Sequence, residues 1–492
     1  MMKRLFFAAL LALVAMLSAA GEARAGGPNG PILKGPWLQH VTSTSAVVQV
    51  EVDPPAPVTL EIGMAAATGT ADSGVGSVVE SREVRALHAL LLQNLEPGTR
   101  YPFTVRVRGS ARYGAVTTAP RDDSSAPVRF LVYGDNRTDD TAHAAVVRAM
   151  AIVPSAFLVH TGDLVDQGGS AKHWQTFFDI EAPLLRERCL FSSVGNHELT
   201  DGAGAQYVKY FGPAELPVVV PKPASSSLVA VPLPADAGSA SFSLEQLSGT
   251  YRWANVRFFL VNGMVDYTSG PTRAWLEKAL TDADAEAGIA WRIVVVHHGP
   301  WSSGPHGGNA HLLDAGIPAL FRAHKVDLVI SGHDHIYERG VSEGLSYLVS
   351  GGGGAPVYRV KKAGPTSRHY ESVHHFIDAT ATASAIQMVA IRPDGSTIER
   401  CALRKVGGWD CDPGATDGGT GADGGATLPA EPPVASRSRC GCDVVGARAT
   451  RTSALTFACA ATLVAVRRRR RREARGRRRG EILGRRCSTS MR

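Results

Sequence analysis

The pattern of apolar and polar residues changes along this 492-residue chain. Between residues 31 and 120 apolar and polar residues partly alternate, as they do in half-buried strands such as residues 45–52. From residue 127 to about 405, short apolar runs alternate with stretches of helical length, a pattern typical of an α/β domain. Helices are expected at 141–152 (opened by Asp140), 170–188, 271–283 and 309–325, the last interrupted by Pro318.

Five short apolar runs of the α/β region are each followed by residues of metal-ligand type. The runs and the residues after them are 128–133 with Asp135, 156–160 with Asp163, 189–194 with Asn196 and His197, 292–296 with His297 and His298, and 325–329 with His333 and His335. In α/β sheets, sites form outside the carboxyl ends of the strands, so these side chains are predicted to converge. The alternative is a set of satisfied polar groups in the core. Carboxylate, amide and imidazole donors without thiolate favour Fe, Mn or Zn.

The ordered motifs resemble those of the calcineurin-like metallophosphoesterase superfamily. They are Gly134-Asp135, Gly162-Asp163, Gly195-Asn196-His197-Glu198, His297 and Gly332-His333-Asp334-His335. Together with the N-terminal β-rich region, they are most similar to those of the purple acid phosphatases, and the resemblance covers residues 31–405. It implies an α/β catalytic domain, a two-sheet sandwich flanked by helices, behind an all-β sandwich of the immunoglobulin or fibronectin type III kind.

The resemblance also implies a role for each matching residue. Asp163 would bridge two metal ions, with Asp135 and His335 completing the first site. Asn196, His297 and His333 would complete the second site. His197 and His306 would face the substrate as catalytic histidines, and the nine-residue step from His297 to His306 favours His297 over His298 as the ligand. Such a metal pair can hold a hydroxide for in-line attack on a phosphoester.

Two residues depart from the family pattern. Arg137 stands two residues after Asp135, where the family has His or Gly, and Asp166 stands three residues after Asp163, where purple acid phosphatases have a tyrosine. The first metal site is therefore one side-chain ligand short unless water or Asp166 fills in. Arg137 could bind a substrate phosphate as a bidentate donor, or it could form a salt bridge to a nearby carboxylate.

The N-terminal region carries a fold signal but no chemistry. Residues 95–101 predict a turn followed by Tyr101 at the start of a strand, which resembles the tyrosine corner of immunoglobulin-like and fibronectin type III sandwiches. Residues 35–39 resemble the entry to the N-terminal domain of purple acid phosphatases. A supporting or binding role is expected for this region.

The ends of the chain carry targeting signals. Residues 1–25 have the basic start, apolar centre and small-residue cleavage site of a signal peptide, so export is predicted. In an oxidising compartment Cys401 and Cys411 are the expected disulfide pair, and Cys189 is expected as a buried free thiol. A cysteine, an apolar run at 452–466 and an arginine cluster at 467–472 resemble a MYXO-CTERM-type sorting tag. A single C-terminal anchor is the alternative.

The net charge of +7 comes from the C-terminal tail. Residues 467–492 contain thirteen arginines and two glutamates, a net of +11, so the rest of the chain is slightly acidic. The body is therefore not expected to bind nucleic acid. Contact with a membrane or the cell envelope is expected only through the C-terminal tag.

These observations predict a domain order and a function. The expected order is a signal peptide (1–25), an all-β domain (31–120), a catalytic domain (127–405), a linker (406–440), a tag (441–472) and a basic tail (473–492). The chain is predicted to be an exported phosphomonoesterase with two metal ions that acts on a small phosphorylated substrate. Two rival predictions are a phosphodiesterase or nucleotide hydrolase with the same centre, and a surface binding protein with a vestigial metal site.

Overall fold

A computed structural model describes residues 30–63, 75–202, 204–212, 220–221, 241–243 and 247–412. All of them lie in the first of two compact units, residues 1–419. The predicted signal peptide, tag and basic tail lie outside the described residues, as do residues 413–440 of the predicted linker and most of the segment 213–246. The linker prediction of 406–440 is wrong at its start, because residues 408–411 form a strand that pairs with the strand before it. No helix among the described residues is long and apolar enough to cross a membrane.

The N-terminal region is built from strands. In the described part between residues 30 and 117 the regular elements are β1 (Ile32–Gln39), β2 (Ala46–Gly63), β3 (Val75–Leu92), β4 (Arg100–Val107) and β5 (Ser110–Thr117). The first half of β2 pairs with β1 and β3, and its second half pairs with β3 and β4. The register shifts between Glu51 and Val58, around Pro54 and Pro55, because proline has no N–H to donate to a ladder.

Tyr101 lies at the start of β4, as the sequence predicted, and closes a turn. Its hydroxyl oxygen accepts a hydrogen bond from the backbone N–H of Glu96 at 2.7 Å, the arrangement of a tyrosine corner. The fibronectin type III assignment itself stays a prediction.

The second region contains two further sheets. The first runs in the order β21-β20-β19-β18-β6-β7-β8. Its strands are β6 (Val128–Tyr133), β7 (Phe157–His160), β8 (Cys189–Ser192), β18 (Phe376–Ala381), β19 (Ala385–Ile391), β20 (Thr397–Arg404) and β21 (Gly408–Cys411). The sheet is parallel only from β6 to β8. Cys401 and Cys411 form the predicted disulfide between β20 and β21, and Cys189 is the buried free thiol that was expected.

The other sheet runs in the order β10-β11-β12-β13-β14-β16-β15-β17. Its strands are β10 (Ser241–Ser243), β11 (Ser248–Trp253), β12 (Val256–Val261), β13 (Trp291–Val296), β14 (Leu328–Ser331), β15 (Tyr337–Ser342), β16 (Leu345–Ser350) and β17 (Ser367–Glu371). β12, β13, β14 and β16 are mutually parallel. The two sheets pack face to face through aromatic side chains, with the Phe130 and Phe258 ring centroids 5.3 Å apart.

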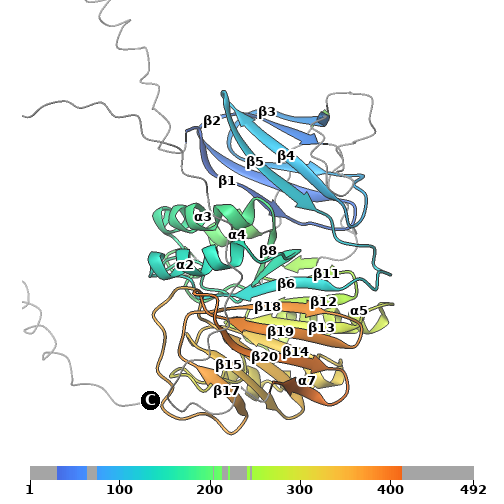
Figure 1. Ribbon diagram of the computed structural model, residues 1–492, viewed down its shortest axis with the longest axis vertical. Coiled ribbons are helices and arrows are strands. Elements are labelled where there is room, and N and C mark those ends of the chain that lie inside the picture. The colour runs from blue at the N-terminus through green and yellow to red at the C-terminus, as the bar shows by residue number, and fades with distance from the viewer. Residues whose placement is uncertain are drawn as a thin grey trace, which may run out of the picture. The chain divides into compact units, whose positions relative to one another are not determined.

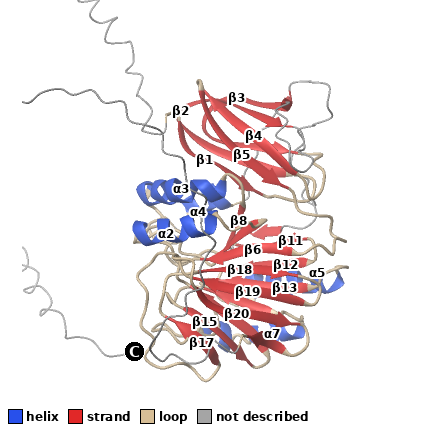
Figure 2. Ribbon diagram, in the orientation of Figure 1, coloured by secondary structure: helices blue, strands red, loops and turns tan. Residues whose placement is uncertain are grey.

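Helices cover the outer faces of both sheets (Figures 1 and 2). Apolar side chains of α2 (Asp140–Ala151), α3 (Ala171–Leu185) and α4 (Ala205–Phe211) share a core with β6, β7 and β8. Those of α5 (Gly270–Ala285), α6 (Ala310–Asp314) and α7 (Ile317–Ala323) share a core with β12, β13 and β14. The prediction of an α/β region with helices near these positions is therefore confirmed.

Two helix boundaries differ from the prediction. Asp139, not Asp140, caps α2, because its backbone is extended and its carboxylate accepts the N–H groups of Thr141 and Ala142, both at 3.0 Å. The predicted helix 309–325 breaks at Gly316, which has a φ of +69°, and Pro318 lies in the first turn of α7.

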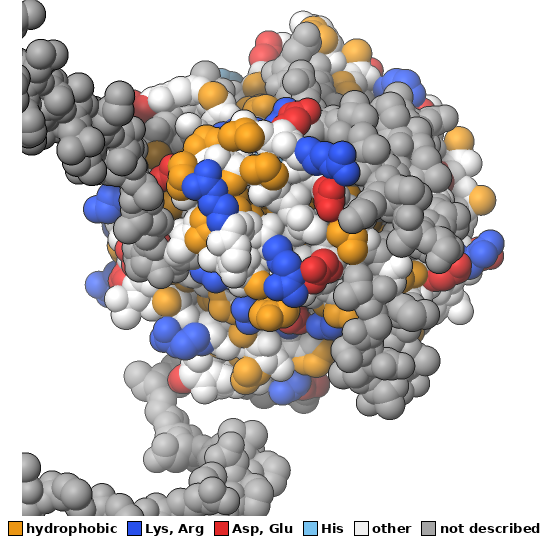
Figure 3. All heavy atoms as spheres, turned by 90° about the horizontal axis from the view of Figure 1, so that it is seen from above, with side chains coloured by type: hydrophobic (Ala, Val, Ile, Leu, Met, Phe, Trp, Pro, Cys, Tyr) orange, Lys and Arg blue, Asp and Glu red, His pale blue; other side chains and the backbone are white. Residues whose placement is uncertain are grey.

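Figure 3 shows one face of the molecule, on which Lys and Arg side chains are interspersed with Asp, Glu and apolar side chains. Among the described atoms visible on this face, no large area of one charge is present.

The strand β1 attaches the N-terminal sheet to helices α3 and α4. Trp37 is fully buried, lies 4.8 Å from the ring of Phe178, and donates from Nε1 to the carbonyl of Tyr210 at 3.2 Å. Beside it, Glu51 pairs with Lys34 and with Lys209. A buried aromatic side chain and a three-residue ion cluster therefore hold this interface.

Replacing Trp37 with alanine removes the largest side chain of the interface. We expect W37A to lower the free energy of unfolding by about 3–5 kcal/mol, measured by urea denaturation. Tyr113→Ala is the matched control, because Tyr113 lies in β5 with 68% of its surface exposed. Equal losses for the two variants would show that Trp37 does not hold the interface.

Candidate metal centre

The loops that follow the parallel strands carry the predicted site residues. Asp135 follows β6, Asp163 follows β7, Asn196 and His197 follow β8, His297 follows β13, and His333 and His335 follow β14. Asp135, Asp163 and His333 have φ angles of +55°, +58° and +70°. Positive φ is uncommon for residues other than glycine and concentrates at functional sites, where surrounding contacts hold it in place.

Asp163, Asn196 and His297 bring two side-chain oxygens and one ring nitrogen together. His297 donates from Nδ1 to the carbonyl of Thr161 at 2.9 Å, so its Nε2 faces the other two residues. Nε2 lies 3.1 Å from Asn196 Oδ1 and 3.3 Å from Asp163 Oδ1. Without an ion, a proton on Nε2 supplies the positive charge between these atoms, and a metal ion bound here would replace that proton. Burial alone would lower the pKa of His297, but the Asp163 and Asp135 carboxylates outweigh it and raise that pKa to about 9.

His333 lies next to this group. Its ring centroid is 5.1 Å from that of His297, and its backbone N–H donates to both carboxylate oxygens of Asp135, at 3.0 and 3.1 Å. Burial and the neighbouring histidines lower the pKa of His333 to about 2. The ring is therefore neutral at physiological pH, which is the state that binds a metal ion.

Asp135 and His335 lie beside Asp163, and the donor atoms of Asp135, Asp163 and His297 form one close group. His335 donates from Nδ1 to the carbonyl of Pro356 at 2.7 Å, which leaves Nε2 facing the site, 3.7 Å from Asp135 Oδ1. Burial, with the nearby Asp163 charge, raises the pKa of Asp135 to about 8. Burial lowers the pKa of His335 to about 4.

Arg137 fills the space between these residues. It donates from Nε to Asp163 Oδ2 at 3.0 Å and from Nη2 to His335 Nε2 at 3.3 Å. Nη1 lies 3.6 Å from Asp166 Oδ1. Of the two interpretations of Arg137, the salt bridge to nearby carboxylates is therefore present in the structure.

His197 and His306 lie at the edge of the site. His197 donates from Nδ1 to the carbonyl of Asp166 at 2.6 Å, and its Nε2 is 3.9 Å from Asp163 Oδ2. His306 is exposed, and its ring centroid lies 4.6 Å from that of His333. His298 instead points Nε2 at the carbonyl of Gly307, 3.2 Å away.

Buried carboxylates hold the loops in place. Glu198 accepts the backbone N–H groups of Asp163, Leu164, Val165 and Gly195 at 2.8–3.3 Å. Asp334 accepts the N–H of His306 at 3.1 Å. These residues touch backbone groups of the site loops, so they position the site residues.

Tyr358 also lies at the site, although no pattern in the sequence points to it. Its ring stacks on His335 with centroids 4.0 Å apart, and its hydroxyl lies 3.5 Å from His306 Nε2. It follows no strand end and belongs to no motif, so only the fold brings it to the site.

The glycine run 351–354 is packed beneath the site. A Cβ at Gly351 would lie 2.3 Å from the carbonyl oxygen of Asp334, and one at Gly353 would lie 2.5 Å from that of Gly134. Only glycine fits at this close approach. Gly352 is equally tight against His375, whose Nδ1 donates to the carbonyl of Val373 at 3.0 Å.

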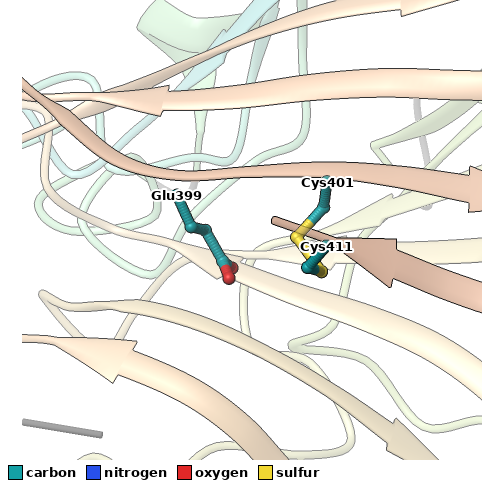
Figure 4. A group of neighbouring side chains, drawn as sticks. All are labelled: Glu399, Cys401 and Cys411. Atoms are coloured by element: carbon teal, nitrogen blue, oxygen red, sulfur yellow. A yellow bond between two sulfur atoms is a disulfide. The ribbon is translucent and has the colours of Figure 1, made fainter. Parts of the chain in front are cut away.

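Two groups of the described residues bring metal-type donor atoms together. One is Asp135, Asp163 and His297. The other is Glu399, Cys401 and Cys411, shown in Figure 4. In the second group the two sulfurs are joined to each other, so no thiolate is present to bind a metal. The donor chemistry of the first group fits a metal ion.

Comparisons with known proteins agree with this geometry. Residues 128–337 match the family model described as calcineurin-like phosphoesterase. The chain contains a calcineurin-like phosphoesterase domain. All five loops that carry the predicted metal ligands lie within this matched segment.

Relatives of the phosphoesterase domain occur in bacteria and plants. An uncharacterized protein of Mycobacterium tuberculosis is 29% identical over 310 residues, covering 55% of this chain and 56% of that protein. Purple acid phosphatase 7 of Arabidopsis thaliana is 29% identical over 186 residues, covering 32% and 56%. The chain spans about half the length of the curated relatives it matches.

Solved structures share the fold. The purple acid phosphatase PPD1 from yellow lupin seeds has a TM-score of 0.58 at 17% identity, covering 75% of this chain and 73% of that one. PhoD has a TM-score of 0.58 at 12% identity, covering 77% and 92%. The predicted metallophosphoesterase-type α/β fold is therefore confirmed.

Glu198→Gln tests how the phosphoesterase domain positions its metal ligands. The glutamine amide places an N–H against backbone N–H groups that now point at a carboxylate oxygen. We expect Zn²⁺ to bind about 10–100-fold more weakly to E198Q by isothermal titration calorimetry. Glu338→Gln is the matched control, because Glu338 is equally buried but accepts from Ser303 and Tyr347. Equal Zn²⁺ affinity in both variants would contradict this role.

We expect the fully buried His375 to make the stability of the folded chain depend on pH. Burial lowers its pKa to about 4 in the folded chain, whereas an unfolded histidine has a pKa near 6.5. As the pH falls from about 6.5 to 4, the unfolded state takes up a proton that the folded state does not, which lowers stability by up to ~3 kcal/mol. We expect H375N to flatten the pH dependence of the unfolding free energy in that range. H311N, at an exposed histidine, is the control and keeps the wild-type profile.

Proposed function

We propose that this chain is a metal-dependent phosphoester hydrolase that acts on phosphomonoesters. The observation that carries the proposal is the convergence of Asp163 Oδ1, Asn196 Oδ1 and His297 Nε2 on one point within a phosphoesterase domain. The likeness to purple acid phosphatases supports the choice of monoesters. An ion bound by these residues would supply Lewis-acid charge to the phosphoryl oxygens and the attacking group.

The protein's own residues supply the remaining charge and the proton. The Arg137 side chain is 15% exposed beside Asp163, and the N–H groups that it does not donate to Asp163, His335 or Thr138 would bind phosphate oxygens. His197 keeps its Nδ1 on the Asp166 carbonyl, which leaves Nε2 beside Asp163 to face the ester. His306 is the exposed imidazole on the His333 side and is placed to protonate a leaving alkoxide.

The two-ion centre implied by the family resemblance has unequal support. The Asn196 side of Asp163 offers acceptor atoms to a cation, whereas on the His335 side Arg137 already donates to the same acceptors. The contact of Arg137 with Asp163 and His335 favours a second candidate function, a binding protein with a vestigial metal site.

Hydrolysis of p-nitrophenyl phosphate and of its bis ester, with added Mn²⁺, Fe²⁺ or Zn²⁺, tests the proposal. We expect the monoester to be the better substrate. H297A removes a ligand and should lose bound metal and reduce turnover at least about a hundredfold. H298A changes the adjacent histidine, which faces Gly307, and should keep its metal.

The outcomes separate the candidate functions. Faster turnover of the bis ester would favour the phosphodiesterase. Wild-type protein without metal and without turnover of either ester would leave only the binding protein. Loss of metal from H298A but not from H297A would overturn the ligand assignment.

We also propose that the protein is exported and reaches the cell surface or the medium. The disulfide between Cys401 and Cys411 supports this proposal, because such bonds persist in oxidising compartments. Attachment to the envelope through the C-terminal segment rests on sequence alone.

A further inference from the structure

The guanidinium of Arg137 contacts two of the atoms that would hold the ion of the first metal site. Its Nε donates to Asp163 Oδ2 at 3.0 Å, and its Nη2 donates to His335 Nε2 at 3.3 Å. These two acceptors are the ones that the family resemblance assigns to the first metal site. Their lone pairs on this side are therefore already engaged by a cation.

The Arg137 guanidinium cannot lose its charge, so it would repel a metal ion bound at the same place. An arginine side chain keeps its charge at all physiological pH values, so a divalent ion bound to the same two atoms would lie against a fixed positive charge. The side chain is only 15% exposed, and a swing outward would break both contacts.

A second departure from the family pattern holds Arg137 in place. Nη1 lies 3.6 Å from Asp166 Oδ1 and donates to Thr138 Oγ1 at 3.2 Å. Thr138 in turn donates from Oγ1 to Asp166 Oδ1 at 3.1 Å. Asp166 stands at the position of the tyrosine ligand of purple acid phosphatases. The residue that replaces the tyrosine ligand, Asp166, is thus a partner of Arg137.

On the Asn196 side of the site, no arginine of the described part of the chain occupies the place of a metal ion. His297 Nε2 lies 3.1 Å from Asn196 Oδ1 and 3.3 Å from Asp163 Oδ1, and no arginine or lysine is bonded to these atoms among the described residues. The two oxygens of Asp163 therefore have different partners. Oδ2 accepts from Arg137, and Oδ1 lies beside His297 and Asn196, where a metal ion would bind.

We propose that this centre binds a single divalent ion, held by Asp163, Asn196, His297 and His333, and that the Arg137 guanidinium replaces the second ion. The proposal deepens the proposed function and rests on it for the use of the site. Arg137 then supplies permanently the second positive charge beside the phosphoryl group. His335 becomes a partner of the arginine, and Asp135 lies between His335 and the group that holds the ion.

Mn²⁺ stoichiometry tests the proposal with a readout that is independent of turnover. The full chain is stripped of metal and titrated with Mn²⁺, with bound ions counted by elemental analysis and the spectrum recorded by electron paramagnetic resonance. We expect one Mn²⁺ per wild-type chain, with the signal of an isolated ion. R137A and R137H should each bind two, with the signal of a coupled pair.

Further variants locate each ion. H297A should reduce the wild-type stoichiometry from one to zero. H335A should leave it at one, whereas the double variant R137A/H335A should fall back from two to one. R148A, at an exposed arginine in α2, is the matched control and should bind one. Thermal melting of each variant establishes that it is folded.

Two ions in the wild-type chain would overturn the proposal even if no arginine variant folds. One ion in folded R137A and R137H would overturn it as well, because removing the arginine would then not create a second site. No ion in the wild type would remove both this proposal and the proposed function. One ion without phosphoester hydrolysis would refute the proposed function and leave the single-ion centre standing.

Discussion

The centre of this molecule is built around two buried carboxylates, whose negative charge has to be stabilised by positive groups and hydrogen-bond donors. Asp135 and Asp163 are almost completely buried at the ends of neighbouring parallel strands, β6 and β7. A buried charge is costly unless it is paired and hydrogen-bonded. Burial raises the pKa of Asp135 to about 8. Burial also acts on Asp163, but His297 and His197 outweigh it and lower the Asp163 pKa. The site thus keeps one strong anion and surrounds it with positive groups.

The parallel strands explain why groups from distant parts of the chain meet at these carboxylates. β6, β7 and β8 end on one edge of their sheet, and β13 and β14 end on one edge of the other. The sheets pack face to face, so both sets of loops reach the same place. Backbone N–H groups of His197 and His333 donate to Asp163 and Asp135, so the loops themselves contribute to the compensation.

Rigid surroundings keep this geometry. Glu198 ties the loop after β7 to the loop after β8, and the glycine run after β16 packs without space for a side chain against the loop after β6. Farther out, Trp37 and the Glu51 ion cluster fix the N-terminal sheet to α3 and α4, which cover the strands that carry Asp135 and Asp163. The N-terminal region therefore packs against the helices that cover the site-bearing strands, and among the described residues it contributes none of the site residues named here.

The sequence by itself determined the features that depend on neighbours in the chain. An apolar run followed by a glycine and a ligand-type residue specifies a buried strand and the turn after it, so β6, β7 and Asp163 could be predicted from local pattern alone. The same holds for most of α2 and α3, and for the disulfide that closes a short loop. Only the tertiary structure decided which side chains meet when they are not neighbours in the chain. It brought Arg137 onto Asp163 and His335, and Tyr358 onto His335. Local pattern cannot encode these contacts, because the partner of a side chain depends on which strands lie side by side and on how the two sheets pack.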